Sequence, residues 1–471
     1  MRKKNLIVNM SVIFFASLFF MFSFYLSIFI SGEALAKDIM VKAALTVDQT
    51  GPVSFQGKAM ENTWRWYAEY INEERGGWKD LKGNTVKLKV LCGDTGLKAA
   101  RTVSLYKKFK GEGALSVFQV TSIEVAAIRS LALRDKMPLP TNSGALVYPL
   151  PSPCFGHWAD YSACSASMID YVKEKWEKSD APWTKKRAPR VAFIGPEGYP
   201  SWSASISPEV MRYAKLKGVD VVGKFFIKLR PIDTKPQVLA AKKAGADFIY
   251  TGILFSQGGA VVRDLYELGL RGESTKEKEK IEIIGMFPMV PIDMIKLMGG
   301  RLEPVKGMRT IGSFAYVGED LPSMNLLRKY AKKYNELDTL GLAYTCGWFG
   351  AIRTAEAIRL ALQKVPGDKL TRGDVWDAFL RIKDFDTGGI VASKVTFTEE
   401  DRIGMKKVRV DEIINKKGAR RKIAYTDYKM LHPIYTEKYA RAHGKKSIYS
   451  EESLKLLKMK VEDVGYKRIK Q

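Results

Sequence analysis

The sequence predicts an α/β protein made of two doubly wound, Rossmann-like lobes. Short β-rich runs alternate with amphipathic helical stretches from Ile39 onward, which is typical of a mainly parallel sheet with helices on both faces. The alternation restarts after a loop rich in Pro, Lys and Trp at 181–190. A length of 471 residues also exceeds that of one ordinary domain.

In the first half, apolar periodicity marks each element; Trp64, Ala68 and Ile71 fall on one face of an expected helix. The expected strands cover 39–47, 86–91, 114–119 and 137–141. The expected helices cover 57–74, 97–109 and 123–134.

The second half repeats the pattern and adds a helical block. Strands are expected at 191–194, 219–226, 248–251 and 281–285, and helices at 203–217, 235–244 and 259–268. The later helices are expected at 323–334, 344–363 and 372–382, with Thr371 as the N-cap of the last. The charged stretch 271–280 is expected to be a surface loop, and the basic part from Tyr425 a surface-wrapping extension.

The first 36 residues have the order of a secretory signal peptide. Basic residues at 2–4 precede an apolar run at 6–30, and Ala34-Leu35-Ala36 supplies a small-x-small cleavage site. Cleavage after Ala36 would export the chain to the periplasm. The apolar run is also long enough for a bilayer of about 30 Å, so an uncleaved anchor stays open. No Cys lies near the boundary, which argues against a lipoprotein anchor.

The composition, 46% hydrophobic and 27% charged, is that of a globular protein with a net charge of +26. Residues 1–36 contribute three basic side chains and one acidic one, so about +24 remains on the exported part. Export argues against nucleic acid as the partner. A basic surface near anionic lipid, or a field that favours anionic ligands, fits better. The dense run Lys416–Lys422 is expected to be a solvated face.

The cysteines leave their pairing open and give no metal site. An oxidising compartment permits disulfides between Cys92, Cys154, Cys164 and Cys346, with three possible pairings. Cys154 and Cys164 are close enough in the chain to pair, but buried free thiols fit equally well. Zinc is not predicted, because the sequence has three histidines and no Cys-x-x-Cys or His-x-x-x-His spacing.

No common catalytic motif is present, so the sequence predicts neither an enzyme nor a cofactor. The phosphate-loop candidate, Gly51–Ala59, has five residues between its glycines and Ala in place of the Mg²⁺-binding hydroxyl. Its amides could still hold an anionic or polar group. No Gly-x-Ser-x-Gly elbow and no Gly-x-Gly-x-x-Gly fingerprint occurs. His157, beside Trp158, is expected to be structural.

Several weak motifs, taken in order, resemble the periplasmic binding proteins of the branched-chain amino acid type that feed ABC importers. The resemblance covers about 40 to 415. The matching residues are Val41–Thr46, Thr50-Gly51-Pro52-Val53 with Gly57, Ile71–Gly77 with Leu81-Lys82-Gly83, Gly93-Asp94 with Lys98-Ala99-Ala100, Ala246–Tyr250, and Phe385–Gly389 with Val395-Thr396-Phe397.

The resemblance implies the type I periplasmic binding protein fold, with two lobes joined by a three-strand hinge. Crossovers near 158, 311 and 402 divide the chain into an N-terminal lobe (37–158 and 312–402), a C-terminal lobe (159–311 and 403–424) and the basic extension (425–471). The ligand would lie between the lobes at the carboxyl ends of the strands, and hinge closure would bury it. The implied partners are a small-molecule ligand and the permease subunits of an ABC transporter, with the protein itself a monomer.

The resemblance also assigns site residues. Ser122, with Thr121 before it, corresponds to the serine that holds a ligand carboxylate, and helix N-termini suit such a group. The loop from Thr141 through Ser143, Gly144 and Ala145 corresponds to the stretch that grips the same group. Tyr199 corresponds to the tyrosine that covers the ligand. The remaining candidates for the pocket wall are Trp202, Phe287, Phe55 and Gln56.

One departure bears on the ligand. Relatives that bind amino acids place an acidic residue after the strand that ends near Gly285, where this chain reads Gly285-Met286-Phe287-Pro288-Met289. An unpaired buried ammonium group would be costly. Either another acid serves, or the ligand is an aliphatic or aromatic carboxylate without an α-ammonium group.

Two other classes of function stay open at this point. The same fold serves as the ligand-binding part of receptors, and an uncleaved first segment would tether a sensor to the membrane. A secreted α/β enzyme that uses acidic residues is the third class, and turnover of a bound ligand would favour it.

Overall fold

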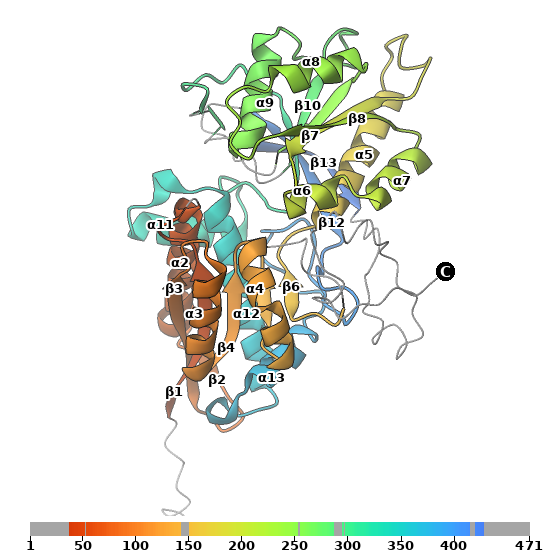
Figure 1. Ribbon diagram of the computed structural model, residues 1–471. Helices are drawn as coiled ribbons and strands as arrows, with labels where there is room; N and C mark the ends of the chain where they lie inside the picture. Colours follow the sequence, from red (N-terminus) through yellow and green to blue (C-terminus); the bar gives the residue numbers. More distant parts are fainter. Residues whose placement is uncertain are drawn as a thin grey trace, which may run out of the picture.

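The computed structural model describes residues 37–51, 53–142, 150–252, 255–286, 294–295, 297–414 and 420–427. Figure 1 shows two lobes, each with a central sheet flanked by helices. The prediction of two doubly wound lobes is therefore confirmed.

The N-terminal lobe contains a six-stranded sheet with the order β2-β3-β1-β4-β5-β6. All neighbours pair in parallel except the short β2, which is antiparallel to β3. The strands are β1 (Asp38–Val47), β2 (Trp78–Lys79), β3 (Thr85–Asp94), β4 (Ala114–Gln119), β5 (Leu139–Thr141) and β6 (Cys154–Gly156). Its helices are α2 (Ser54–Glu69), α3 (Ala99–Gly111), α4 (Ser122–Arg134), α11 (Pro322–Lys333), α12 (Leu342–Leu362) and α13 (Arg372–Phe379).

The C-terminal lobe contains a seven-stranded sheet with the order β13-β12-β11-β10-β9-β7-β8. The strands from β8 to β11 are parallel, whereas β12 and β13 are antiparallel to their neighbours. They are β7 (Arg190–Pro196), β8 (Asp220–Ile227), β9 (Phe248–Thr251), β10 (Glu282–Met286), β11 (Arg309–Gly312), β12 (Lys407–Ile413) and β13 (Arg420–Asp427). The helices are α5 (Tyr161–Glu177), α6 (Pro200–Ser205), α7 (Pro208–Leu216), α8 (Lys235–Lys243) and α9 (Phe255–Glu267).

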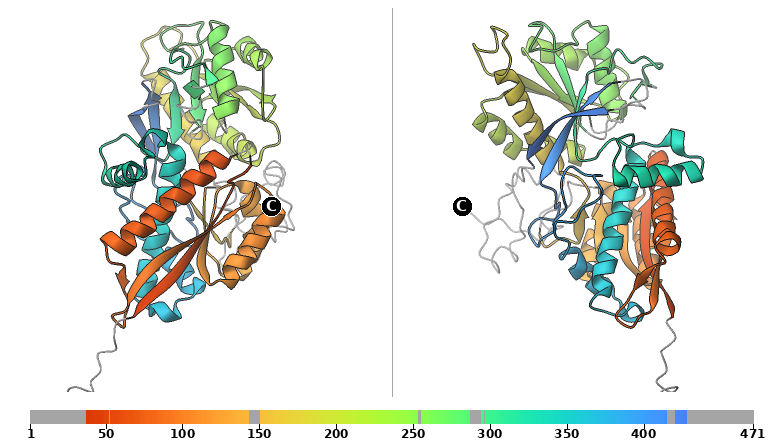
Figure 2. Two further views of the ribbon diagram at one scale, coloured as in Figure 1. Left: turned by 90° about the vertical axis from the view of Figure 1, so that its left-hand side faces the viewer. Right: turned by 180° about the vertical axis from the view of Figure 1, so that it is seen from behind.

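The chain crosses between the lobes three times: from β6 to α5, from β11 to α11, and from α13 to β12. Figure 2 shows the result from two further sides, with α11 and α12 beside the N-terminal lobe although β11 before them belongs to the other sheet. Positions 158, 311 and 402 fall within or next to these crossings, and the exact boundaries stay predictions. Strand β13 continues to Asp427, so it includes the first three residues of the predicted basic extension, 425–427.

Some expected elements differ from the structure for local reasons. The helix expected at 203–217 is two helices, because Pro208 begins α7 and Ser207 caps it by accepting from the N–H of Val210. The helix expected at 57–74 begins three residues earlier and ends in one π-helical turn, Tyr70–Glu74. Thr371 is an N-cap as predicted, in a reciprocal capping box with Asp374.

The four cysteines are free thiols, so the possible disulfide between Cys154 and Cys164 is not formed. Cys154, Cys164 and Cys346 are buried. Among the described helices, none combines the length and the apolar character that a membrane span requires.

Candidate functional site

The two lobes touch at the carboxyl edge of the first sheet, where a strand-to-helix turn from each lobe meets. The turn after β4 brings Ser122 to the first residue of α4, and the turn after β7 brings Ser201 into α6. Their hydroxyl oxygens lie 3.5 Å apart. This contact places the predicted carboxylate-binding serine between the lobes, where type I binding proteins would hold a ligand.

The start of α4 is held by a capping box. The hydroxyl of Thr121 accepts from the N–H of Glu124 at 3.3 Å, and the N–H of Thr121 donates to the Glu124 carboxylate at 2.9 Å. Thr95 also donates to that carboxylate, at 2.6 Å. Burial raises the pKa of Glu124 above its usual range. Thr121 therefore fixes the helix end that presents Ser122, and a direct ligand contact from it stays a prediction.

The C-terminal lobe contributes hydroxyl groups to the same place. Ser201, which is 2% exposed, hydrogen-bonds to Tyr161, the first residue of α5. Tyr199 lies half-buried beside Tyr161, and burial raises the pKa of both phenols. The contact between the lobes thus brings together hydroxyl groups from both lobes. Sequence reasoning passed over the hydroxyl groups of Ser201 and Tyr161, although Ser201 is next to the named Trp202 and Tyr161 begins a helix.

Trp202 lies in the core of the C-terminal lobe. It is 1% exposed, and its ring stacks on Tyr250 with centroids 6.2 Å apart and meets the edge of Phe193. The ring also lies over Gly195 in β7, where a Cβ atom would stand 2.2 Å from it. These contacts give Trp202 a packing role, and its place in the pocket wall stays a prediction.

In the loop before α2, two backbone N–H groups are hydrogen-bonded to a carboxylate of the same loop. The carboxylate of Asp48 accepts from the N–H of Gly51 at 2.6 Å and of Val53 at 2.9 Å. An internal carboxylate therefore already occupies these two amides, and binding of an external anion by other amides of this turn stays a prediction. In the next turn Phe55 is 44% exposed and Gln56 is half-buried.

Other predicted site residues lie outside the described residues: Ser143, Gly144, Ala145 and Phe287. Thr141 and Asn142, which lead into the first of these segments, are buried at the end of β5. The C-terminal end of β10 at Met286 likewise leads to Phe287. Both strands end at the carboxyl edge of their sheets, which agrees with the general position of ligand sites in such folds.

His157 is structural, as predicted. It is fully buried; its Nδ1 accepts from Arg353 at 2.5 Å, and its Nε2–H donates to the carbonyl oxygen of Cys346 at 2.5 Å. Burial, and then the charge of Arg353, lower the pKa of His157 well below its usual value. Burial also lowers the pKa of Arg353 to about 9. The ring is therefore neutral and fixed in one tautomer.

Two other features of the described residues bear on a second site. No group of three or more His, Cys, Asp or Glu side chains in the described ranges could hold a metal ion. An open groove of about 550 Å³ runs along α7 and β8, lined by Met211, Lys215 and 218–224. The groove follows β8, which is the outer strand of its sheet, and contains none of the predicted site residues.

Comparison with protein families now identifies the class. A family model described as "Periplasmic binding protein" matches residues 40–419, so the chain belongs to the periplasmic binding protein family. Its two lobes with three crossings are the type I form of that fold. No curated protein sequence matches the chain.

Solved structures share this fold at low identity. A branched-chain amino acid ABC transporter protein from Thermus thermophilus with bound valine has a TM-score of 0.68 at 18% identity, covering 87% of this chain and 100% of the other. A fatty acid ABC transporter substrate-binding protein from Thermomonospora curvata has 0.66 at 21%, covering 83% and 93%. A solute-binding protein of an ABC transporter from Rhodopseudomonas palustris BisB5, in complex with 3,4-dihydroxybenzoic acid, has 0.62 at 17%, covering 83% and 98%.

Proposed function

We propose that the chain is an exported solute-binding protein that captures a small carboxylate-bearing ligand between its lobes and delivers it to an ABC importer. The observation that carries the proposal is the meeting of Ser122 and Ser201 across the lobes at the start of α4. A helix N-terminus with adjacent hydroxyl groups stabilises an anion through its amides and its dipole. Closure of the lobes around that point would remove the ligand from water.

The acids that flank this point favour a ligand without an ammonium group. Asp48 accepts from two amides of its own loop, and Glu124 accepts from Thr95 and Thr121. Asp160 caps α5 by accepting from the N–H groups of Ser162 and Ala163 at 2.9 and 3.0 Å. An ammonium group would have to compete with these bonds. The similar solved structures include one with valine and one with an aromatic acid, so both ligand classes belong in the test.

The proposal includes export and partners. Residues 1–36 would direct the chain to the periplasm and would be removed by cleavage after Ala36. The protein would then bind the permease subunits of the importer as a monomer. N-terminal sequencing of the exported protein checks the cleavage. Lys37 as the first residue supports a free carrier, whereas an intact first segment favours the membrane-tethered sensor.

A thermal-shift screen tests the ligand class. The purified exported protein is unfolded and refolded to remove any carried-over ligand, and then screened against amino acids, aliphatic and aromatic carboxylates, and their amides. A ligand that binds only the folded state raises the melting temperature, by the equivalent of about 2.7 kcal/mol at 100 times Kd. We expect a shift with carboxylates that Ser122→Ala reduces.

The matched control for this screen lies on the same helix. Ser130→Ala makes the same chemical change at an exposed position of α4 and should leave the shift intact. A shift confined to the amides would contradict the carboxylate assignment. A ligand recovered chemically changed would point to an enzyme.

A further inference from the structure

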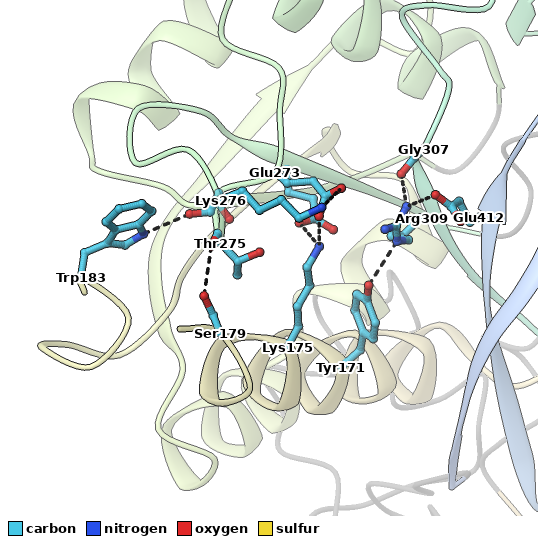
Figure 3. A network of polar contacts seen from close by, with 12 residues as sticks. Tyr171, Lys175, Ser179, Trp183, Glu273, Thr275, Lys276, Gly307, Arg309 and Glu412 are labelled. Carbon is cyan, nitrogen blue, oxygen red and sulfur yellow. Dashed lines mark hydrogen bonds and ion pairs between the residues drawn. The ribbon is translucent and has the colours of Figure 1, made fainter. Parts of the chain in front are cut away.

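The strand pair β11–β12 forms the hinge side of the C-terminal sheet and contains two arginines, each of which makes an ion pair with a glutamate. In this antiparallel pair Arg309 is opposite Glu412, and Gly312 is opposite Arg409. Arg309 donates to Glu412 at 3.0 Å and to the hydroxyl of Tyr171 at 3.2 Å (Figure 3). All of these residues belong to the C-terminal lobe, so this first ion pair holds one lobe together.

The second ion pair connects β12 of the C-terminal lobe to a residue in the loop before α11. Arg409 is 2% exposed, and its guanidinium makes a bidentate ion pair with Glu319. Its Nη2 donates to Oε1 at 2.6 Å, and its Nη1 donates to Oε2 at 3.3 Å. The same guanidinium donates to Asp411 on its own strand at 3.0 and 3.1 Å. Paired, planar hydrogen bonds between charged groups are the strong kind, and burial reduces their screening by salt.

Glu319 belongs structurally to the N-terminal lobe. It lies in the loop between β11 and α11, and its carboxylate accepts from the N–H of Tyr316 at 2.6 Å. Its carbonyl oxygen accepts from Arg328 of α11 at 2.9 Å. The same loop is also bonded to the segment that follows α13, since the N–H of Ala315 donates to the carbonyl oxygen of Ile390 at 2.9 Å. Arg409 is therefore fixed in the C-terminal sheet, whereas Glu319 is bonded to α11 beside the N-terminal lobe.

We propose that the Arg409–Glu319 ion pair is an interlobe brace that limits how far the lobes swing apart. A rotation that opens the cleft would break the two hydrogen bonds between Arg409 and Glu319. Of its partners Glu319 and Asp411, the guanidinium would then keep only Asp411. Separating the pair is costly because the Arg409 guanidinium is buried and would not regain full hydration, although the Glu319 side chain is 29% exposed. The brace would therefore keep the ligand-free protein near the arrangement in which Ser122 and Ser201 meet, and would lower the free energy needed to close the lobes on a ligand.

Distance measurement between spin labels tests the brace without any ligand, so its outcome is independent of the proposed function. Labels are attached at Lys107→Cys on α3 and Lys243→Cys on α8, both exposed and one on each lobe, in a Cys92→Ser background. Glu319→Gln removes the charge but keeps an oxygen for the N–H of Tyr316. We expect a longer mean distance and a broader distribution in this variant than in the parent.

The other ion pair of the same strands supplies the control. Glu412→Gln breaks the Arg309 pair inside the C-terminal lobe and should leave the interlobe distance unchanged. Arg409→Lys keeps the charge without the bidentate geometry and should give an intermediate distribution. An unchanged distribution in Glu319→Gln, or equal broadening in Glu412→Gln, would overturn the proposal. Circular dichroism of each variant establishes that both lobes are folded.

Discussion

The hydroxyl oxygen of Ser122 lies 3.5 Å from that of Ser201, although the two residues belong to different lobes. A carboxylate beside this contact would accept a hydrogen bond from each lobe. Because hydrogen bonds to charged groups contribute about 1.5–3 kcal/mol, Ser201→Ala should weaken carboxylate binding roughly tenfold to a hundredfold. Titration calorimetry of the two single variants and the double variant checks this. Strict additivity of the two effects would show that the hydroxyl groups do not act on one ligand group.

The turn into α2 should not tolerate a side chain at Gly57. A Cβ atom there would stand 1.9 Å from the carbonyl oxygen of Asp48, and backbone cannot rotate away as a flexible side chain can. Gly57→Ala should lower the free energy of unfolding by about 3 kcal/mol or more. Gly111→Ala, at the end of α3 with nothing within 4 Å of the new atom, should be neutral or stabilise by up to about 1 kcal/mol. Urea unfolding of both variants compares them; equal effects would contradict the close approach.

A substitution at Trp202 can distinguish a role in packing from a role in ligand contact. Its ring is enclosed by Tyr250, Phe193 and Gly195, so Trp202→Phe should cost about 1–3 kcal/mol of unfolding free energy. If packing is its whole role, the Kd of the ligand changes less than about twofold. A larger change in Kd at unchanged stability would instead place Trp202 in the pocket wall.

His157 predicts a pH dependence of stability. Because its pKa in the folded protein is well below that of an unfolded histidine, only the unfolded chain takes up this proton as the pH falls below about 6.5. The contribution is therefore fully present above that pH and is lost below it, at about 1.4 kcal/mol per pH unit. Urea unfolding at pH 7.5, 6.5 and 5.5 measures the slope. His157→Gln should be less stable at pH 7.5 but have a shallower slope, and an equal slope would contradict the assignment.

Most of the fold follows from local patterns. The strands 114–119 and 248–251 are apolar runs with turn residues on either side, and the structure has them at the expected positions. Strands β12 and β13 were missed because charged residues occupy them. Arg409 and Asp411 can be buried in β12 because they pair with each other and Arg409 also pairs with Glu319. The break before Pro208 was visible as a Ser-Pro start signal within the expected helix.

The candidate site was less accessible to sequence reasoning. The position of Ser122 follows from the turn between a strand and a helix. Its neighbour Ser201 is 79 residues away in the chain, and the two meet only because the two lobes are in contact. The occupied amides of Gly51 and Val53 were hidden for a similar reason, because no pattern shows that Asp48 turns back onto its own loop. Both the Ser122–Ser201 contact and the occupied amides depend on the three-dimensional arrangement, which no local sequence pattern shows.

Hydrogen exchange with and without a saturating carboxylate ligand is the most direct test of a site shared by both lobes. Peptides that cover 119–125 and 199–206 report on the two turns that meet at Ser122 and Ser201. A ligand held between the lobes predicts slower exchange in both peptides at the same ligand concentration. Protection in only one of them, or only along β8, would contradict the interlobe site.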